Sequence, residues 1–432
     1  MKSKYLLRKS TIVFILSCII SCNKDDMKKP DLPKHTFTIN YRGQTTDVKE
    51  FHLILSSGNN KILDTLMSTS TDHIVDFKSE SDRIDLSLIS VNDAVNNTLQ
   101  PITVHNIITF LAVTPGNWSV TLDCDEYLYT SEPYVTQAIQ PATIHYTNVP
   151  VVPDDFQGYI WFSNRDKSNG SNKTMVYTPN QMTLDINYQK GPSDFLYLLA
   201  ESKGKYFFLE NPDLNATVDF ANASDAIKIK YPELDYKSVY AALYGYTESV
   251  APFSSGTWIY ANYYNSNRRN SEYDLIYPGS AFKKYKSWVT WSDPSSNSYG
   301  QYYFGSTALT SIQPWDASYI NIKKNTTQEL VLEFPKEQPT FYKEALATSS
   351  SNVIWRIYGP PTVTSIKPEI IYEHLKRAID PNVNFTDLQV KSVVIGKADN
   401  LSYQDFWSII FDKNVLTNRG ITSSKKFTKK LN

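Results

Sequence analysis

Aromatic and amide side chains are concentrated between residues 236 and 304, and these residue types suit the recognition of sugars. Aromatic residues make up 13% of the whole chain. Their density in this stretch is roughly double what ordinary composition would give. A tyrosine or tryptophan ring packs on the apolar C–H face of a sugar, while amide, guanidinium and carboxylate groups bind the sugar hydroxyls. The side chains that we take as candidate ligand contacts are Trp258, Tyr260, Tyr264, Trp288, Trp291, Arg268 and Asp293.

Two other roles fit the same residues. Tyrosine and tryptophan also give rigid contact area in protein–protein interfaces, and in a β-rich chain they serve equally well as ordinary strand residues of a core. Trp288 and Trp291 are three residues apart. In one strand they would therefore face opposite sides of the sheet, and at most one of the pair belongs to a single binding platform.

None of the common catalytic or metal-binding motifs occurs in the chain. Its six histidines form neither an HxH nor an HExxH spacing, so a zinc site has no support, and there is no GxSxG elbow or phosphate-binding glycine loop. Asp123, Asp125 and Glu126 either ligate calcium through oxygen or form a solvated turn. We predict no catalytic residue, no metal and no cofactor, although carboxylates that meet only in three dimensions would escape sequence reasoning.

The first 22 residues combine a basic start with a short apolar run. Four basic residues lie within the first nine, and residues 11–20 are apolar. A run of about ten residues is too short to span a bilayer, which needs about twenty. Ile19-Ile20-Ser21-Cys22 resembles the lipobox of bacterial lipoproteins, with residues 15–18 as a rival box. The resemblance implies that residues 1–21 are a signal peptide and that Cys22 is lipid-modified and becomes the first residue.

The residues after Cys22 are charged, and residues 23–26 (Asn-Lys-Asp-Asp) resemble the export signal of surface lipoproteins in some Gram-negative bacteria. That resemblance implies an outer-membrane protein that faces the medium, whereas the alternative is a merely solvated tether. Removing residues 1–21, with their four basic residues and no acidic ones, takes the formal net charge from −1 to −5. An acidic chain gives no electrostatic reason to bind nucleic acid.

Apolar and polar residues alternate with a period of two from residue 35 onward. Phe37, Ile39 and Tyr41 alternate with polar residues, as do Ile84, Leu86 and Leu88, and turn signals recur about every ten residues, which is typical of β-sandwiches. Residues 58–61 and 170–173 start a weak internal repeat, for which chance similarity is the alternative. We predict a mainly β chain of tandem immunoglobulin-like sandwich modules. The predicted ranges are 1–21 (signal peptide), 22–35 (tether), 36–147, 148–234 and 235–335 (β modules) and 336–432 (a small α+β part).

The last hundred residues show helical as well as strand patterns. Pro368 starts a helix with an apolar stripe, residues 388–395 form an apolar strand, and Ser402 to Asp405 resembles a capping box that starts a second helix. The basic end, residues 425–430, is interpreted as a solvated, frayed terminus rather than a binding patch.

The lipobox and the β-module layout are broadly similar to surface glycan-binding lipoproteins that accompany outer-membrane transporters. This resemblance implies a non-enzymatic role, with the membrane as one partner through the lipid and either a glycan or an outer-membrane protein as the other. Two alternatives stay open, namely a structural or adhesive surface protein and a carboxylate-dependent hydrolase.

Overall fold

The structure is a computed structural model of mainly β type with packed sheets, which confirms the predicted fold class. Within the described part of the chain, no helix is long and apolar enough to cross a membrane. The described residues are 34–42, 48–57, 62–68, 72–95, 99–121, 140–150, 158–164, 174–177, 183–191, 194–201, 203–231, 238–247, 256–265, 273–313, 315, 317–348, 352–376, 387–406 and 421–431.

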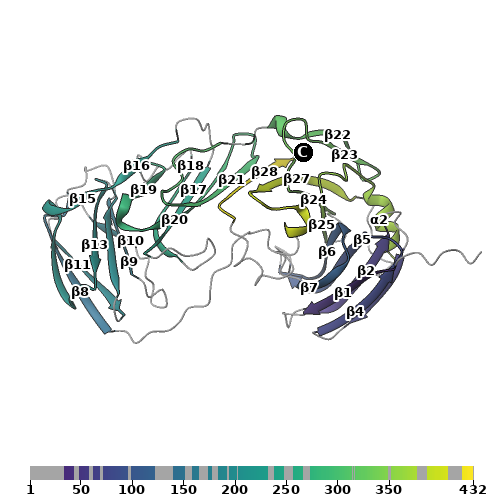
Figure 1. The fold of residues 1–432 in the computed structure, drawn as a ribbon, viewed down its shortest axis with the longest axis horizontal. Coiled ribbons are helices and arrows are strands. Elements are labelled where there is room, and N and C mark those ends of the chain that lie inside the picture. The colour runs from purple at the N-terminus through teal and green to yellow at the C-terminus, as the bar shows by residue number, and fades with distance from the viewer. Residues whose placement is uncertain are drawn as a thin grey trace, which may run out of the picture.

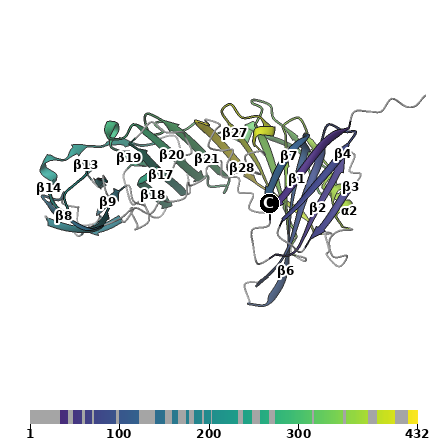
Figure 2. The ribbon, with the colours of Figure 1, turned by 60° about the horizontal axis from the view of Figure 1, so that its bottom comes forward.

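A single sheet of twelve strands, the main sheet, runs through the middle of an arch-shaped molecule (Figures 1 and 2). Its strands pair antiparallel, except for the parallel pair β25 and β6. In spatial order they are β18 (Thr257–Asn265), β17 (Ser238–Tyr246), β20 (Lys284–Ser292), β21 (Ser298–Gly305), β28 (Ser423–Lys430), β27 (Gln389–Ala398), β24 (Phe341–Ala347), β25 (Val353–Gly359), β6 (Pro101–Val113), β5 (Ile84–Val95), β2 (Val48–Ser57) and β3 (Ile62–Ser68).

One face of the main sheet carries two hydrophobic cores, because alternate side chains of each strand point to it. Over β24 and β27 the covering elements are β22 (Asn321–Asn325), β23 (Leu330–Glu333), β26 (Ser365–Ile366) and helix α2 (Pro368–Leu375). Over β17 and β20 they include β16 (Ile227–Ile229) and β19 (Leu275–Tyr277). Tyr299 packs against both cores, which therefore meet across β21.

The opposite face of the main sheet is covered at the amino-terminal end by a three-stranded sheet. Its strands are β4 (Asp72–Ser79), β1 (His35–Arg42) and β7 (Gly116–Thr121). Phe37 and Ile39 of β1 are fully buried against Leu86 and Leu88 of β5. This end of the molecule is thus a sandwich of two sheets, as the alternation around those residues predicts.

A second sandwich lies at the other end of the arch (Figure 1). Its core joins the sheet β10 (Thr174–Tyr177), β9 (Gly158–Asn164), β12 (Phe195–Ala200), β13 (Lys205–Glu210) and β15 (Ser224–Asp225) to the sheet β11 (Thr183–Lys190), β8 (Gln140–Thr147) and β14 (Asn215–Asp219). Strand β12 is buried on both faces: Leu196 and Leu198 lie in this core, while Phe195 and Tyr197 reach the core under β17. Short 3-10 turns are η2 (Phe220–Asn222), η3 (Gly279–Ala281) and η4 (Ala317–Tyr319).

The helix and strand predicted for the carboxy-terminal part are present. Helix α2 begins at Pro368, and β27 covers most of the predicted strand. The capping box is formed, because the backbone N–H of Asp405 donates to Ser402 Oγ at 3.1 Å and that of Ser402 donates to Asp405 Oδ2 at 3.0 Å. The rest of the predicted second helix lies outside the described residues.

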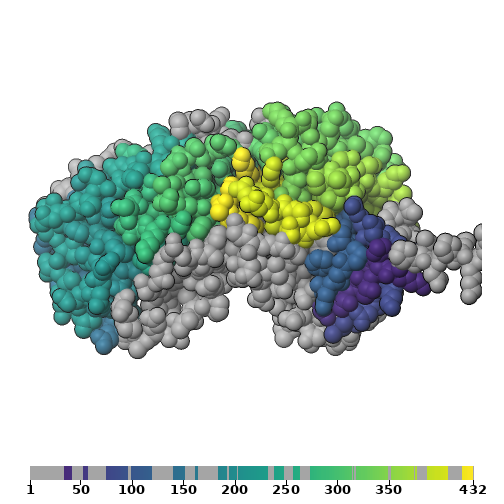
Figure 3. All heavy atoms as spheres, in the orientation of Figure 1, coloured from purple at the N-terminus to yellow at the C-terminus, as the bar shows by residue number. Residues whose placement is uncertain are grey.

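The prediction of a frayed basic terminus is wrong. Residues 423–430 form β28, which pairs with β21 on one side and β27 on the other. Figure 3 shows this carboxy-terminal segment in the middle of the molecule. Phe427 is fully buried beside Tyr299, with ring centroids 5.0 Å apart. Backbone pairing on both sides and this one buried ring hold the strand despite its four lysines.

The predicted module ranges stay a prediction, and the pairing adds two facts about them. Strands from the ranges 36–147, 235–335 and 336–432 share the main sheet. In addition β8, from the range 36–147, pairs with β11 and β14 of the second sandwich. Segments that the sequence presents as successive modules are therefore joined by hydrogen bonds across the molecule.

Candidate functional site

A groove lies across β17, β20, β21 and β28, on the face of the main sheet opposite the two large cores. Its volume is about 440 Å³, and it extends to Phe341 of β24 and Gly396 of β27. We call it the aromatic groove. Its lining side chains fall into three parallel rows, because each residue on this face stands beside its registered neighbour on the next strand.

The central row of the aromatic groove is lowest at Gly300, which has no side chain. In register order it runs from Tyr240 through Thr290, Gly300, Lys426 and Gly396 to Phe341. A Cβ at Gly300 would lie 3.7 Å from both Lys426 Cβ and Thr290 Cγ2. That distance is ordinary van der Waals contact, so a larger side chain at Gly300 would project into the groove instead of clashing with the sheet.

The row on one side of Gly300 is aromatic. Trp288 of β20 stands beside Tyr302 of β21, and the Trp288 ring meets the Tyr240 ring edge to face, with centroids 6.1 Å apart. Trp288 is half-buried and Tyr302 is buried. Burial raises the pKa of both Tyr240 and Tyr302 above the ordinary value of 10, so both phenols remain hydrogen-bond donors at neutral pH.

The row on the other side carries only hydroxyls. Ser238, Ser292, Ser298 and Thr428 stand in register on four neighbouring strands. The hydroxyl oxygens of Ser238 and Ser292 are 2.7 Å apart, within hydrogen-bond distance. The aromatic groove thus offers rings along one wall and hydrogen-bonding hydroxyls along the other.

The charge of the groove comes from Lys426, since no described residue that lines it is Asp or Glu. Lys425 also borders the groove, but it alternates with Lys426 in β28, so its side chain points to the opposite face, as that of Phe427 does. These lining residues supply no pair of carboxylates for acid–base work on a bound molecule. The described residues also contain no group of three His, Cys, Asp or Glu side chains that could hold a metal ion. Stacking and hydrogen bonding are therefore the chemistry that these residues can perform.

The three candidate tryptophans occupy three different environments. Trp288 lines the groove, whereas Trp291 is buried on the opposite face and stacks on Tyr299 at 5.3 Å. This confirms that the two face opposite sides of one strand. Trp258 is half-buried outside the groove lining, where its indole N–H donates to the backbone oxygen of Tyr260 at 2.8 Å.

Tyr260 and Asp293 make contacts within the protein and do not line the groove. Tyr260 is fully buried, and its ring centroid is 5.9 Å from that of Trp161. The Asp293 carboxylate accepts hydrogen bonds from the backbone N–H and side-chain amide of Asn297 and from the Tyr299 hydroxyl, each at 2.9 Å. Asp293 therefore fixes the hairpin that joins β20 to β21.

The remaining candidates lie outside what the structure describes. They are Arg268 and Cys22, the side chain of Tyr264, and the acidic residues around Cys124. Conversely, Gly300, the hydroxyl row and Lys426 line the groove although sequence reasoning did not select them. Period-two alternation alone would have placed Ser292, Thr290 and Trp288 on one face. The pairing of β21 with the distant β28 could not be predicted, because nothing in the sequence of either segment indicates its partner.

Comparisons with known proteins assign no family. No protein-family model and no curated protein matches the chain. Among solved structures, a candidate adhesin from Bacteroides thetaiotaomicron is 10% identical with a TM-score of 0.14, over 40% of this chain and 79% of that one. The open form of the pilus adhesin SpaC from Lactobacillus rhamnosus GG is 9% identical with a TM-score of 0.12, over 76% of this chain and 44% of that one. TM-scores this low do not establish a shared fold and carry no argument about function.

Proposed function

We propose that this chain is a glycan-binding lipoprotein without catalytic activity, anchored in an outer membrane through lipid on Cys22 and facing the medium. The observation that carries the binding role is the two-sided character of the aromatic groove. Rings form one wall, serine and threonine hydroxyls form the other, and Gly300 lies between them.

A sugar presents the same two-sidedness. Its axial C–H groups form an apolar patch that stacks on an aromatic ring, while its hydroxyls need donors and acceptors when water is displaced. Trp288 and Ser292 lie four residues apart on β20, so their backbone positions are about 14 Å apart along the strand. The central row lies between these two residues. A ligand therefore has the width of that one row between the aromatic wall and the hydroxyl wall.

Binding without hydrolysis agrees with the chemistry of the lining. Glycosidases use two carboxylates about 5–10 Å apart, and none of the described groove residues is Asp or Glu. The anchor is supported by the lipobox-like residues 19–22 and the charged residues 23–26. Acyl chains on Cys22 would hold the protein at the bilayer, each buried methylene contributing about 0.8 kcal/mol.

Affinity electrophoresis tests the binding role. The purified chain is run through native gels that contain laminarin, hydroxyethyl cellulose, amylopectin, glucomannan or polygalacturonate. We expect at least one of these polymers to retard the protein, and we expect Trp288→Ala and Gly300→Leu each to abolish that retardation, the first by removing the ring and the second by filling the groove. The matched control is Trp258→Ala, which changes a tryptophan outside the lining and should keep the retardation.

Two results contradict the proposal. One is that none of the five polymers slows the wild-type protein. The other is that both groove variants migrate like the wild type in every gel while circular dichroism shows them folded. The anchor is tested separately by mass spectrometry of the native amino terminus, where a diacylglyceryl-modified Cys22 is expected and an unmodified Met1 contradicts it.

A further inference from the structure

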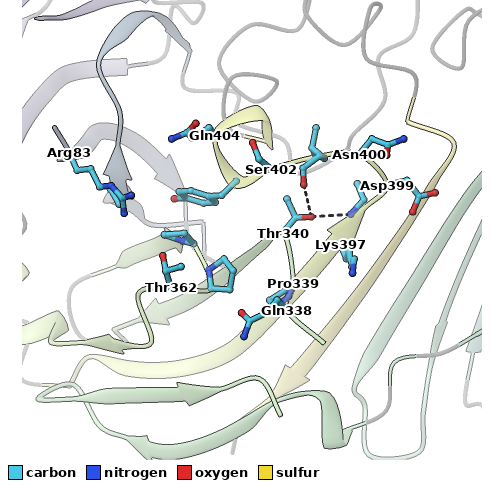
Figure 4. Close-up of a pocket in the computed structure, with 16 residues that line it drawn as sticks. Arg83, Gln338, Pro339, Thr340, Thr362, Lys397, Asp399, Asn400, Ser402 and Gln404 are labelled. Atoms are coloured by element: carbon cyan, nitrogen blue, oxygen red, sulfur yellow. Dashed lines mark hydrogen bonds between the residues drawn. The ribbon is translucent and has the colours of Figure 1, made fainter. Parts of the chain in front are cut away.

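We propose that the aromatic groove continues into a second pocket, so that one site binds an oligosaccharide chain across both. This inference rests on the proposed glycan binding and names its ligand as a chain of several sugars. The second pocket, the polar basin, has a volume of about 850 Å³. It lies where β24 begins and β27 ends, beside the helical turn at residues 403–406 (Figure 4).

The polar basin carries amide and hydroxyl groups on a lining that also includes three prolines and other apolar residues. The amide and hydroxyl groups belong to Gln338, Thr362, Asn400, Ser402 and Gln404. Amides and hydroxyls both donate and accept hydrogen bonds, which matches the requirement of sugar hydroxyls. Charged residues of both signs, Arg83, Lys397 and Asp399, also line the pocket, although the Lys397 ammonium is bonded to the carboxylate of Glu337 outside it.

The rim of the polar basin is held by internal hydrogen bonds. The Thr340 hydroxyl donates to the backbone oxygen of Leu401 at 3.3 Å and accepts from the backbone N–H of Ala398 at 3.2 Å (Figure 4). The Tyr403 hydroxyl lies 3.1 Å from the backbone oxygens of Leu111 and Tyr358. A pocket fixed in this way loses little conformational freedom when a ligand binds.

The two pockets adjoin each other. Phe341 and Gly396 line the aromatic groove, whereas the preceding Thr340 and the following Lys397 line the polar basin. Successive residues of a strand are about 3.4 Å apart. The ring of Phe341 stands at the border between the two pockets. It lies directly over Gly396, because a Cβ at this glycine would be 2.3 Å from the ring.

Strands β27 and β28 also meet at the border between the two pockets. Ser424 of the aromatic groove is the registered neighbour of Ala398, which lines the polar basin. The Phe341 ring also stacks on Phe406 with centroids 3.8 Å apart, and Phe406 ends the turn whose Tyr403 lines the basin. Phe341 and Phe406 are both buried, so a ligand that leaves the groove passes beside this ring pair, over Ser424 and Ala398, and reaches amides and hydroxyls.

The combined length argues for an oligosaccharide instead of a single sugar. From Tyr240 to Phe341 the central row crosses six strands, which spans about 24 Å at the usual strand separation. The polar basin extends this path beyond β24. A chain that lies along both pockets makes more contacts with each added sugar until the basin is filled, so affinity should report chain length.

Isothermal titration with laminari-, cello-, malto- and manno-oligosaccharides, from trisaccharide to octasaccharide, tests this. In the series that binds, the octasaccharide should bind at least about tenfold more tightly than the trisaccharide because it adds hydrogen bonds in the basin. The variant Gln338→Ala/Thr362→Ala/Gln404→Ala should bind the octasaccharide only as tightly as the wild type binds the trisaccharide, and should bind the trisaccharide unchanged. The variant Trp288→Ala should lose binding of both the trisaccharide and the octasaccharide.

The outcomes separate the two proposals. If no oligosaccharide of the four series binds the wild type, the glycan-binding role itself fails. If trisaccharide and octasaccharide bind the wild type equally, the groove binds sugar but the continuous site is refuted. The continuous site is also refuted if the octasaccharide binds more tightly and the triple variant retains that full advantage.

Discussion

Glu344 is a buried acid whose removal should change how stability depends on pH. It lies in β24, its side chain is fully buried, and neither of its carboxylate oxygens has a hydrogen-bond partner among the described residues. Burial raises the pKa of Glu344 from 4.5 to about 8. The protonated acid is thus the form that the folded protein holds at neutral pH.

The sign and size of the effect follow from linkage. Because the folded protein binds this proton more tightly than the unfolded chain does, stability is highest below the unfolded pKa and is lost as the pH rises through the folded pKa. Over the whole range the loss is about 5 kcal/mol. About 2 kcal/mol of it falls between roughly pH 6.5 and 9.

Urea unfolding followed by tryptophan fluorescence measures this loss. Between about pH 6.5 and 9 the free energy of unfolding of the wild type should fall by about 2 kcal/mol more than that of Glu344→Gln, whose amide does not titrate. The window stays above the pKa of about 6 to which burial raises Asp85 and below the range in which tyrosines ionise. Glu210→Gln, at an exposed strand end, should follow the wild type. Parallel curves for wild type and Glu344→Gln would refute a neutral, buried Glu344.

Three further changes probe the framework. Phe427→Ala should lower the free energy of unfolding by about 3–5 kcal/mol because it empties a fully buried ring site in the central strand β28; a loss below about 1 kcal/mol in urea unfolding would show that β28 adds little to the fold. Ser402→Ala removes the acceptor for the Asp405 N–H and should cost about 1 kcal/mol, measured in the same way, with an unchanged midpoint as the contrary result. Asp293→Ala leaves the Tyr299 hydroxyl and the Asn297 backbone N–H without their acceptor and should cost about 1–3 kcal/mol; glycan binding that falls without any loss of stability would instead place Asp293 in the binding site.

Local patterns in the sequence were sufficient for the class of fold and for parts of the site. Alternation predicted β structure, and the spacing of Trp288 and Trp291 predicted their opposite faces because side chains alternate strictly along a strand. The unbroken apolar run of residues 195–200 has its physical reason in a strand buried on both faces. Both helix starts were marked by local features: Pro368 by its fixed φ and missing N–H, which suit the first helical position, and the Ser402–Asp405 pair by its reciprocal hydrogen bonds.

What could not be predicted depends on pairing between distant segments. Strand β28 has one buried ring and four lysines, so its own sequence is that of a solvated tail, and only its neighbours β21 and β27 make it a strand. The groove rows follow from the register of Gly300 with Lys426, and register is set by tertiary packing, not by either strand alone. Asp293 looked like a ligand contact because the sequence does not show which acceptors a hairpin uses for itself.

The measurement that tests the account most directly is a crystal structure of the protein with a bound octasaccharide from the series that binds. The account predicts a sugar ring stacked on Trp288, hydroxyls of the same chain hydrogen-bonded to Ser292 or Ser298, and the chain continuing over Ser424 and Ala398 toward Gln338 and Gln404. An oligosaccharide bound elsewhere on the protein, with the groove between Trp288 and the hydroxyl row containing only water, would contradict it.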